Sequence, residues 1–208
     1  MRPILRLLVV VFTLLVSPAA WAQSTTYHLH IESWDDADAA NQLLATGPDA
    51  PAAVIRTTLN LRNEPPSVHG FGVPLAHFKG AIGDHGVGVI PVGTVVTFSF
   101  WMRKTTNAGT LHPFISMSNG DDPGRQIICN SGSVFGLPPL TTTLTKYVVN
   151  CTVSQPITMT ATNFLNLGVA VYVAVTPKNK NVWGELHLEG VLNGNYDSTV
   201  VVPNTVPE

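Results

Sequence analysis

Hydrophobic residues recur at every second position in several segments of the chain. The clearest example is VWGELHLEGV, residues 182–191, in which small and aliphatic residues alternate with Trp183, Glu185, His187 and Glu189. A strand that buries one face alternates in this way, so the aliphatic set is expected in a core and the other set is expected to face water. The same alternation in residues 26–32, 95–104 and 165–176 predicts three further strands of this kind.

Turn-forming sequences separate these and other strand-like segments. PVG at 91–93, TTNAG at 105–109 and NGDDPG at 119–124 contain the glycine, proline, asparagine and aspartate residues that favour tight turns. Only residues 35–45 have a composition that favours a helix, and that segment is short. Many short strands with regular turn signals predict an all-β fold, an antiparallel two-sheet β-sandwich of the jelly-roll kind.

The length of the chain is that of one such sandwich, which we place at residues 23–192. Residues 193–208 contain an NGN turn and two prolines, and they end in polar residues. These features indicate a C-terminal tail. The segment STVVV within it could add one extra edge strand.

The first 22 residues have the features of a secretory signal peptide. Arg2 and Arg6 form a short basic start, and residues 4–16 are mostly apolar. Ala20 and Ala22 flank a tryptophan in the small-residue pattern that precedes a cleavage site. The apolar run is shorter than the roughly 20 residues that a membrane-spanning helix needs. We therefore expect cleavage after Ala22 and a secreted, periplasmic or cell-surface protein that has no membrane span.

The charge of the chain argues against one class of partner, and its two cysteines predict a disulfide. Without the two arginines of the leader, the chain keeps 9 basic and 13 acidic side chains, a formal charge of −4. It has no basic run, and phosphate backbones are bound by clustered Lys and Arg, so nucleic acid is not an expected partner. The two cysteines, Cys129 and Cys151, are expected to form one disulfide in an oxidising compartment.

The polar faces of the predicted strands combine single aromatic rings with hydrogen-bonding side chains. An aromatic ring can stack on the apolar face of a sugar, while carboxylates, amides and guanidinium groups bond its hydroxyls. Such a face is a candidate ligand site, although the same rings could instead be covered by loops or by a second layer of strands. The candidate ligand-binding residues are Trp101, Trp183, Glu185, His187, Arg103 and Tyr172.

Two patterns are candidates for metal binding. His28 and His30 point the same way on a strand, and together with Glu32 they could hold a transition metal. The acidic stretches 32–38 and 119–124 supply oxygen ligands of the kind that calcium uses, so a structural Ca²⁺ is a further candidate. Both stretches also suit ordinary turns, in which Asp and Asn bond the backbone.

The sequence lacks the common catalytic motifs, including G-x-S-x-G, H-E-x-x-H and glycine-rich phosphate loops. Glu185 and Glu189 are four residues apart on one strand face, which separates their backbones by about 13 Å. The two carboxyl groups of a glycosidase lie about 5 to 10 Å apart. The sequence therefore predicts a protein that is not an enzyme.

The segments GVIPVGTVVTFSFWMRK and VWGELHLEG resemble those of jelly-roll β-sandwich modules of the carbohydrate-binding and galactose-binding-like type, which occur as secreted bacterial modules. The resemblance covers residues 26–191. It implies an antiparallel sandwich that binds glycans through exposed aromatic residues, a role that Trp101 and Trp183 match by type and face. It also implies a structural Ca²⁺.

We therefore expect a secreted, non-catalytic carbohydrate-binding protein whose partner is a polysaccharide or glycan. The alternative is a structural or adhesive subunit of the cell surface. In that case the sheet edges and the C-terminal segment would pair with further copies by strand addition and form a homo-oligomer.

Overall fold

The computed structural model describes residues 23–30, 41–44, 53–59, 73–121, 124–134, 136–175, 182–188 and 197–207. The expected signal peptide, Glu32, Glu189 and the acidic stretch 32–38 lie outside these residues. The regular elements of the described ranges are all β-strands. No helix within those ranges is long and apolar enough to cross a membrane.

Thirteen strands follow one another along the described ranges. In chain order they are β1 (Ser24–His30), β2 (Asn41–Leu44), β3 (Ala53–Leu59), β4 (Val73–Lys79), β5 (Gly88–Ile90), β6 (Val95–Lys104), β7 (Thr110–Ser118), β8 (Ile127–Asn130), β9 (Thr145–Thr152), β10 (Ile157–Met159), β11 (Asn166–Val175), β12 (Val182–Leu188) and β13 (Thr199–Pro203). Strand β2 lies in the one segment whose composition favours a helix. Its pairing with β1 and β4 overrides that weak local preference.

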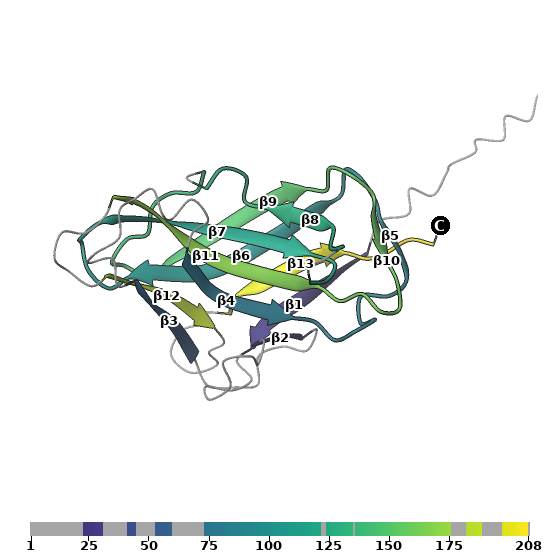
Figure 1. Cartoon of the computed structure of the whole chain (residues 1–208), viewed down its shortest axis with the longest axis horizontal. Coiled ribbons are helices and arrows are strands. Elements are labelled where there is room, and N and C mark those ends of the chain that lie inside the picture. Colours follow the sequence, from purple (N-terminus) through teal and green to yellow (C-terminus); the bar gives the residue numbers. More distant parts are fainter. Residues whose placement is uncertain are drawn as a thin grey trace, which may run out of the picture.

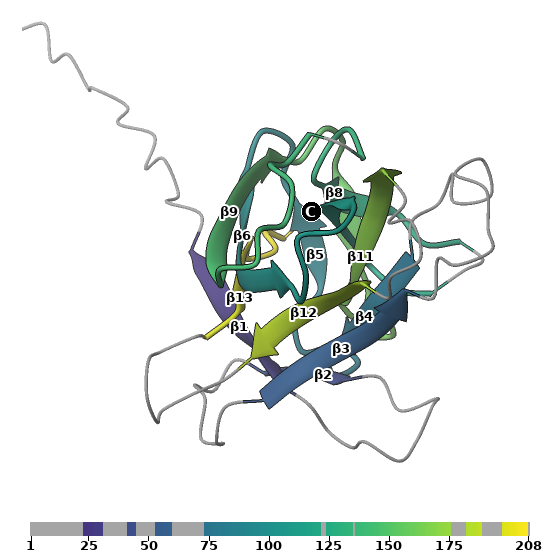
Figure 2. The same ribbon diagram turned by 90° about the vertical axis from the view of Figure 1, so that its left-hand side faces the viewer.

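The strands form two facing layers around β6 and β11. One edge of β6 pairs with β9, and the other edge pairs first with β13 and then with β12. Strand β1 continues this layer beyond β13, and β3 continues it beyond β12. The second layer has the order β4–β11–β7–β8. Figure 1 and the end-on view in Figure 2 show the two layers facing each other.

The two layers are connected at both of their sides. On one side β2 pairs antiparallel with β1 and parallel with β4. On the other side a disulfide joins Cys129 of β8 to Cys151 of β9, whose Cα atoms are 6.0 Å apart. The predicted antiparallel sandwich and the predicted disulfide are therefore confirmed, and the β2–β4 pair is the parallel exception among the described pairings.

The core lies between the layers and follows the alternation of the sequence. On β6 the inward side chains Phe98, Phe100 and Met102 are buried, whereas the residues between them are half-buried. The inward residues of a sandwich interdigitate in this way to form one core. The opposing layer contributes Leu111, Ile115, Met117, Val169 and Val171, all of which are buried.

Strand β13 differs from the tail or edge strand that the sequence predicted. It pairs with β1 on one side and with β6 on the other, so it is an interior strand of the first layer. Val200 and Val202 point into the core and are fully buried. The polar and proline-containing flanks of this short segment indicated a tail, but long-range pairing places it inside the sheet.

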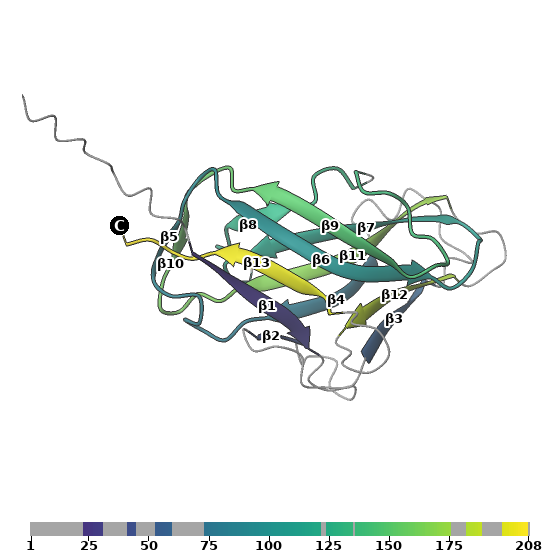
Figure 3. The ribbon, with the colours of Figure 1, turned by 180° about the vertical axis from the view of Figure 1, so that it is seen from behind.

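A small separate sheet of β5 and β10 covers one end of the sandwich (Figures 1 and 3). The C-terminal residues close against it, because Val89 and Val206 exchange two backbone hydrogen bonds of 2.9 Å. Gly88 has a φ of 139°, and an added Cβ would collide with the carbonyl oxygen of Val206. This close approach of two backbones requires glycine.

Candidate functional site

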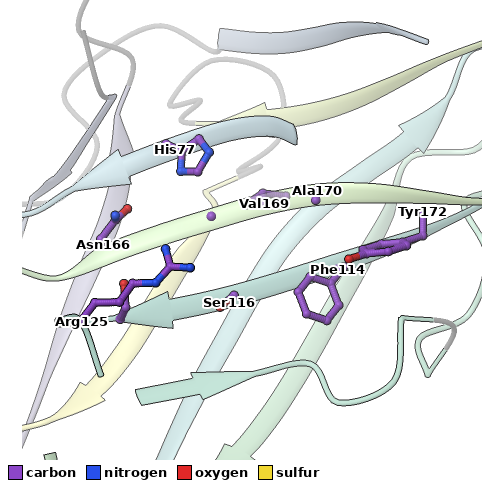
Figure 4. Close-up of a pocket in the computed structure, with 10 residues that line it drawn as sticks. His77, Phe114, Ser116, Arg125, Asn166, Val169, Ala170 and Tyr172 are labelled. Atoms are coloured by element: carbon purple, nitrogen blue, oxygen red, sulfur yellow. The ribbon is translucent and has the colours of Figure 1, made fainter. Parts of the chain in front are cut away.

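A groove with a cavity of about 280 Å³ lies on the outer face of the second layer (Figure 4). Its floor is formed by β4, β11 and β7, whose outward side chains alternate with those of the core. The side chains that give the groove its chemistry are His77 from β4, Asn166 and Tyr172 from β11, Phe114 and Ser116 from β7, and Arg125 from the turn before β8.

The middle of the groove is open because Gly168 lies in a row between two polar residues. Strand register places Gly168 opposite His77 on one side and opposite Ser116 on the other. A Cβ at Gly168 would lie 3.6 Å from Cε1 of His77, so the imidazole rests over the glycine. The missing side chain leaves both the imidazole and the Ser116 hydroxyl on an open floor.

A hydrogen-bonded turn positions Arg125 at one end of the groove. The backbone N–H of Gln126 donates to Oδ1 of Asn119 at 2.7 Å, and the backbone N–H of Asn119 donates to the carbonyl of Gln126 at 3.1 Å. Nδ2 of Asn163 donates to the carbonyl of Asn119 at 2.9 Å. Figure 4 shows the Arg125 side chain reaching from this turn toward Asn166 and the floor of the groove.

The same end of the groove contains a carboxylate whose charge is already compensated. Asp121 accepts hydrogen bonds from Nδ2 of Asn166 at 2.6 Å and from Nζ of Lys79 at 2.7 Å. Asn166 is 7% exposed, and its Oδ1 is buried without a hydrogen-bond partner. Lys79 balances Asp121, and the guanidinium of Arg125 adds hydrogen-bond donors at this end, which suit an anionic or carbonyl oxygen.

The opposite end of the groove is aromatic. The rings of Phe114 and Tyr172 meet edge to face, with centroids 5.3 Å apart and an interplanar angle of 69°. Figure 4 shows both rings at the far end from Arg125. The groove therefore runs from a cationic, hydrogen-bonding end to an apolar end, an arrangement that fits a small molecule with one polar and one apolar part.

Four of the predicted ligand-binding residues come together on a different surface, the outer face of β6 and β12. Register pairs Arg103 with Glu185 and Trp101 with His187. Nε of Arg103 lies 2.5 Å from Oε2 of Glu185, and Nε2 of His187 lies 3.4 Å from the same oxygen. The fifth, Trp183, also lies on β12, but its side chain is outside the described part of the structure.

Glu185 corrects the expectation that this face is exposed to water. Its side chain is 1% exposed, while that of Arg103 is 38% exposed. A carboxylate is buried at tolerable cost only when it is paired, and Arg103 provides that pairing. Period-two alternation separates the two faces of a strand, but it does not show whether the second face is covered.

Tyr172 was also grouped with this face by sequence, and the structure places it in the groove on the other layer. Alternation put the tyrosine correctly on the outward side of β11. It could not show which layer β11 belongs to, because that depends on pairing with β4 and β7. The groove itself was missed, since His77, Ser116, Arg125 and Asn166 come from separate segments without a shared local motif.

The two predicted metal sites, one at His28 and His30 and one for Ca²⁺ in the acidic stretches, stay predictions. Nδ1 of His28 lies 2.7 Å from Oδ2 of Asp197, and His30 lies on the same side of β1. Among the described residues, no group of three or more His, Cys, Asp or Glu side chains could hold a metal ion. In the stretch 119–124, Asp121 is engaged by Lys79 and Asn166.

A buried histidine that the sequence did not single out joins three parts of the fold. His85 is 7% exposed; its Nε2–H donates to the carbonyl of Pro203 at 2.8 Å, and its Nδ1 accepts from the Tyr27 hydroxyl at 2.9 Å. Burial lowers the pKa of His85, although the Pro203 carbonyl and the charge of Asp84 oppose that shift. Burial and Asp84 raise the pKa of Tyr27.

Comparison with known proteins identifies similar folds but no family. The sequence matches no family model and no curated protein. The structure is similar to two crystal structures of a CocE/NonD family hydrolase from Staphylococcus aureus. One has 11% identity and a TM-score of 0.53, covering 91% of this chain and 38% of that chain. The other has 10% identity and a TM-score of 0.51, and the match covers 89% of this chain and 37% of that chain.

This chain therefore spans less than two-fifths of the length of those hydrolases. At such low identity the likeness shows the fold alone. The solved structures that it resembles are parts of hydrolases rather than carbohydrate-binding modules. This finding overturns the expectation of a non-catalytic carbohydrate-binding protein, and with it the structural-subunit alternative and the expectation that the protein is not an enzyme. Strand alternation predicted the sandwich correctly, but many functions share that architecture.

Proposed function

We propose that the protein takes part in the hydrolysis of a small ester or amide and that the groove over β4, β11 and β7 binds the substrate. The observation that carries this proposal is the convergence of a guanidinium, an imidazole and an aromatic pair on one open floor. The fold that the chain shares with CocE/NonD family hydrolases supports it.

The two ends of the groove would receive different parts of the substrate. Arg125 would bind a carboxylate or the carbonyl oxygen that becomes negative during acyl transfer, since charge-assisted hydrogen bonds are the strong ones. Phe114 and Tyr172 would hold the apolar substituent. The cavity of about 280 Å³ is smaller than most pockets for drug-sized ligands, roughly 300–1,000 Å³, so the substrate would be small.

His77 is the side chain best placed to move a proton. Its imidazole lies over Gly168 in the middle of the groove, between the proposed oxyanion site at Arg125 and the aromatic end. A neutral imidazole in that place would accept a proton from an attacking water molecule and return it to the leaving group.

The test is the release of p-nitrophenol from the p-nitrophenyl esters of acetic and phenylacetic acid. We expect hydrolysis above the buffer rate, with the phenylacetyl ester preferred. His77→Ala and Arg125→Ala should each lower kcat/KM about tenfold or more. The matched control is Lys146→Ala, which removes an exposed cation from β9 and should leave the rate unchanged. Hydrolysis at the buffer rate, or hydrolysis that both groove variants retain, would contradict the proposal.

We also propose that the protein is exported. The leader-like residues 1–22 and the disulfide between Cys129 and Cys151 support this location, because disulfides persist in oxidising compartments. Fractionation of the producing cells should find the protein outside the cytoplasm with both cysteines blocked to thiol reagents. A cytoplasmic protein with two free thiols would contradict this location.

A further inference from the structure

An amine, a side-chain amide and a carboxylate are in direct contact at the Arg125 end of the groove. Oδ2 of Asp121 accepts a hydrogen bond from Nζ of Lys79 at 2.7 Å, and Oδ1 of the same carboxylate accepts one from Nδ2 of Asn166 at 2.6 Å. One carboxylate therefore holds a nucleophile and an acyl group side by side and could carry a proton between their two nitrogens.

Strand pairing independently holds Lys79 opposite Asn166. The two residues are Cα partners in the antiparallel pair of β4 and β11, and such partners have Cβ atoms about 4.5–5.5 Å apart on one face of a sheet. Lys79 points outward, since Phe78 beside it is buried in the core. Its Nζ lies 5.5 Å from the centroid of the Phe164 ring, and this cation–π contact keeps the amine over the start of β11.

The turn that carries Asp121 is tied down by its own hydrogen bonds. Oγ of Ser118, at the end of β7, donates to the carbonyl of Gly120 at 2.8 Å. Nδ2 of Asn163, just before β11, donates to the carbonyl of Asn119 at 2.9 Å. Because β7 and β11 are neighbours in the sheet, these bonds keep the carboxylate of Asp121 over the pair of β4 and β11.

The exposure of the three side chains suits a reaction between them. Asn166 is 7% exposed, so its acyl carbon is shielded from attack by water. The side chains of Lys79 and Asp121 are 40% and 49% exposed, which leaves a path by which ammonia can leave. A shielded amide beside a held amine favours attack by the amine, because the two groups are already in place.

We propose that Lys79 and Asn166 form an intramolecular isopeptide bond, an amide between two side chains, which joins β4 to β11 covalently. Asp121 takes a proton from the ammonium of Lys79, and the free amine attacks Cγ of Asn166. The bond from Nζ to Cγ forms, Asp121 passes its proton to Nδ2, and the bond from Cγ to Nδ2 breaks, which releases ammonia.

The reaction balances without an oxidant or a second substrate. The new amide nitrogen gives its surplus proton to the ammonia, which departs as ammonium, and Asp121 returns to its carboxylate form. The ion pair between Lys79 and Asp121 is the arrangement before the reaction. The bond lies beside the groove, and its formation does not depend on the proposed hydrolysis.

The test is the mass of the purified protein and of its tryptic peptides. Wild type should be lighter than its sequence by the mass of one ammonia molecule, in addition to the two hydrogens lost in the disulfide. After reduction, trypsin should release one branched peptide that joins residues 63–103 to residues 147–178, because an acylated Lys79 is no longer a cleavage site.

Two variants are matched to this test. Lys79→Arg keeps a cation beside Asp121, but a guanidinium stays protonated and does not attack an acyl group, so residues 80–103 and 147–178 should appear as separate peptides. Asp121→Ala keeps both reacting groups and should lower the yield of the branched peptide at least tenfold. An N-terminal Gln23 can also lose ammonia by cyclising, but that loss lies in the first peptide and is common to all variants.

Thermal unfolding gives a second measurement. The bond would close a loop of about 90 residues and would restrict the unfolded chain as a disulfide does. We expect wild type to unfold about 10 °C above Lys79→Arg, which retains the ion pair with Asp121 and lacks only the bond.

Three results would overturn the proposal. The first is a wild-type protein that has lost only the two hydrogens of the disulfide and gives residues 80–103 and 147–178 as separate peptides, which would leave Lys79 and Asp121 as an ion pair alone. The second is the loss of one water molecule instead of ammonia, which would place the acyl group on a carboxylate such as Asp121. The third is an undiminished branched peptide in Asp121→Ala, which would remove Asp121 from the reaction.

Discussion

Removal of the Arg103 side chain tests the ion pair on the outer face of β6 and β12. Arg103→Ala removes the contact at 2.5 Å from the carboxylate of Glu185, which is 1% exposed, and keeps the contact with His187 at 3.4 Å. Breaking a fully buried pair in this way costs about 3–5 kcal/mol. The Arg103 side chain is 38% exposed, so water screens part of the interaction, and we expect a loss of about 1–3 kcal/mol in the free energy of unfolding.

The loss is measured by urea denaturation, with the slope of the transition unchanged and its midpoint lowered. Lys146→Ala removes an exposed cation on the neighbouring strand β9 and should stay within about 0.5 kcal/mol of wild type. Arg103→Ala/Glu185→Met, which removes both charges, should recover most of the lost stability, because the buried carboxylate is then gone. An Arg103→Ala variant as stable as Lys146→Ala would refute the argument that Arg103 compensates a buried charge.

Three further predictions concern the buried histidine, the disulfide and the groove. Because burial lowers the pKa of His85 from its ordinary 6.5, the unfolded chain binds a proton more readily. The contribution of neutral His85 to the free energy of unfolding is therefore fully present above pH 6.5 and is lost as the pH falls from there to the pKa of the folded state. His85→Gln should reduce the difference in the free energy of unfolding between pH 7.5 and pH 5, measured by denaturation curves. Cys129→Ser should cost about 3 kcal/mol in urea, as expected for a sequence separation of 22, and an unchanged midpoint would show that the bridge adds nothing. Gly168→Val should abolish ester hydrolysis by filling the floor beside His77 while leaving the unfolding midpoint unchanged or raised, since valine suits a strand; full activity in this variant would separate the groove from the reaction.

The sequence was sufficient for the fold class because strand alternation is a local property. The inward residues of β6 and β12, such as Phe98, Met102 and Leu186, are buried as their period predicts. The disulfide followed from there being two cysteines, and its pairing is confirmed. Strand β13 was misplaced because its position between β1 and β6 depends on pairing with segments more than 90 residues away.

The candidate site could be predicted only in part from the sequence, because it too depends on which distant strands become neighbours. Arg103, Glu185 and His187 are close in space, as expected from their faces, but the burial of Glu185 depends on what covers the face. The groove needs His77, Ser116 and Arg125 from three segments, and Gly168 contributes by lacking a side chain. A pattern of outward residues on single strands does not show which strands become neighbours, so the groove emerged only from the register of β4, β11 and β7.

The central claim is that the groove binds the substrate, and the most direct measurement is chemical-shift mapping of the labelled protein with phenylacetate, a product of the proposed reaction. We predict saturable shifts of the backbone amides of Ser116, Arg125 and Gly168, with those of Trp101 and Glu185 unchanged, and loss of these shifts in Arg125→Ala. Shifts confined to the face around Trp101 and Glu185, or no saturable shifts at all, would contradict the claim.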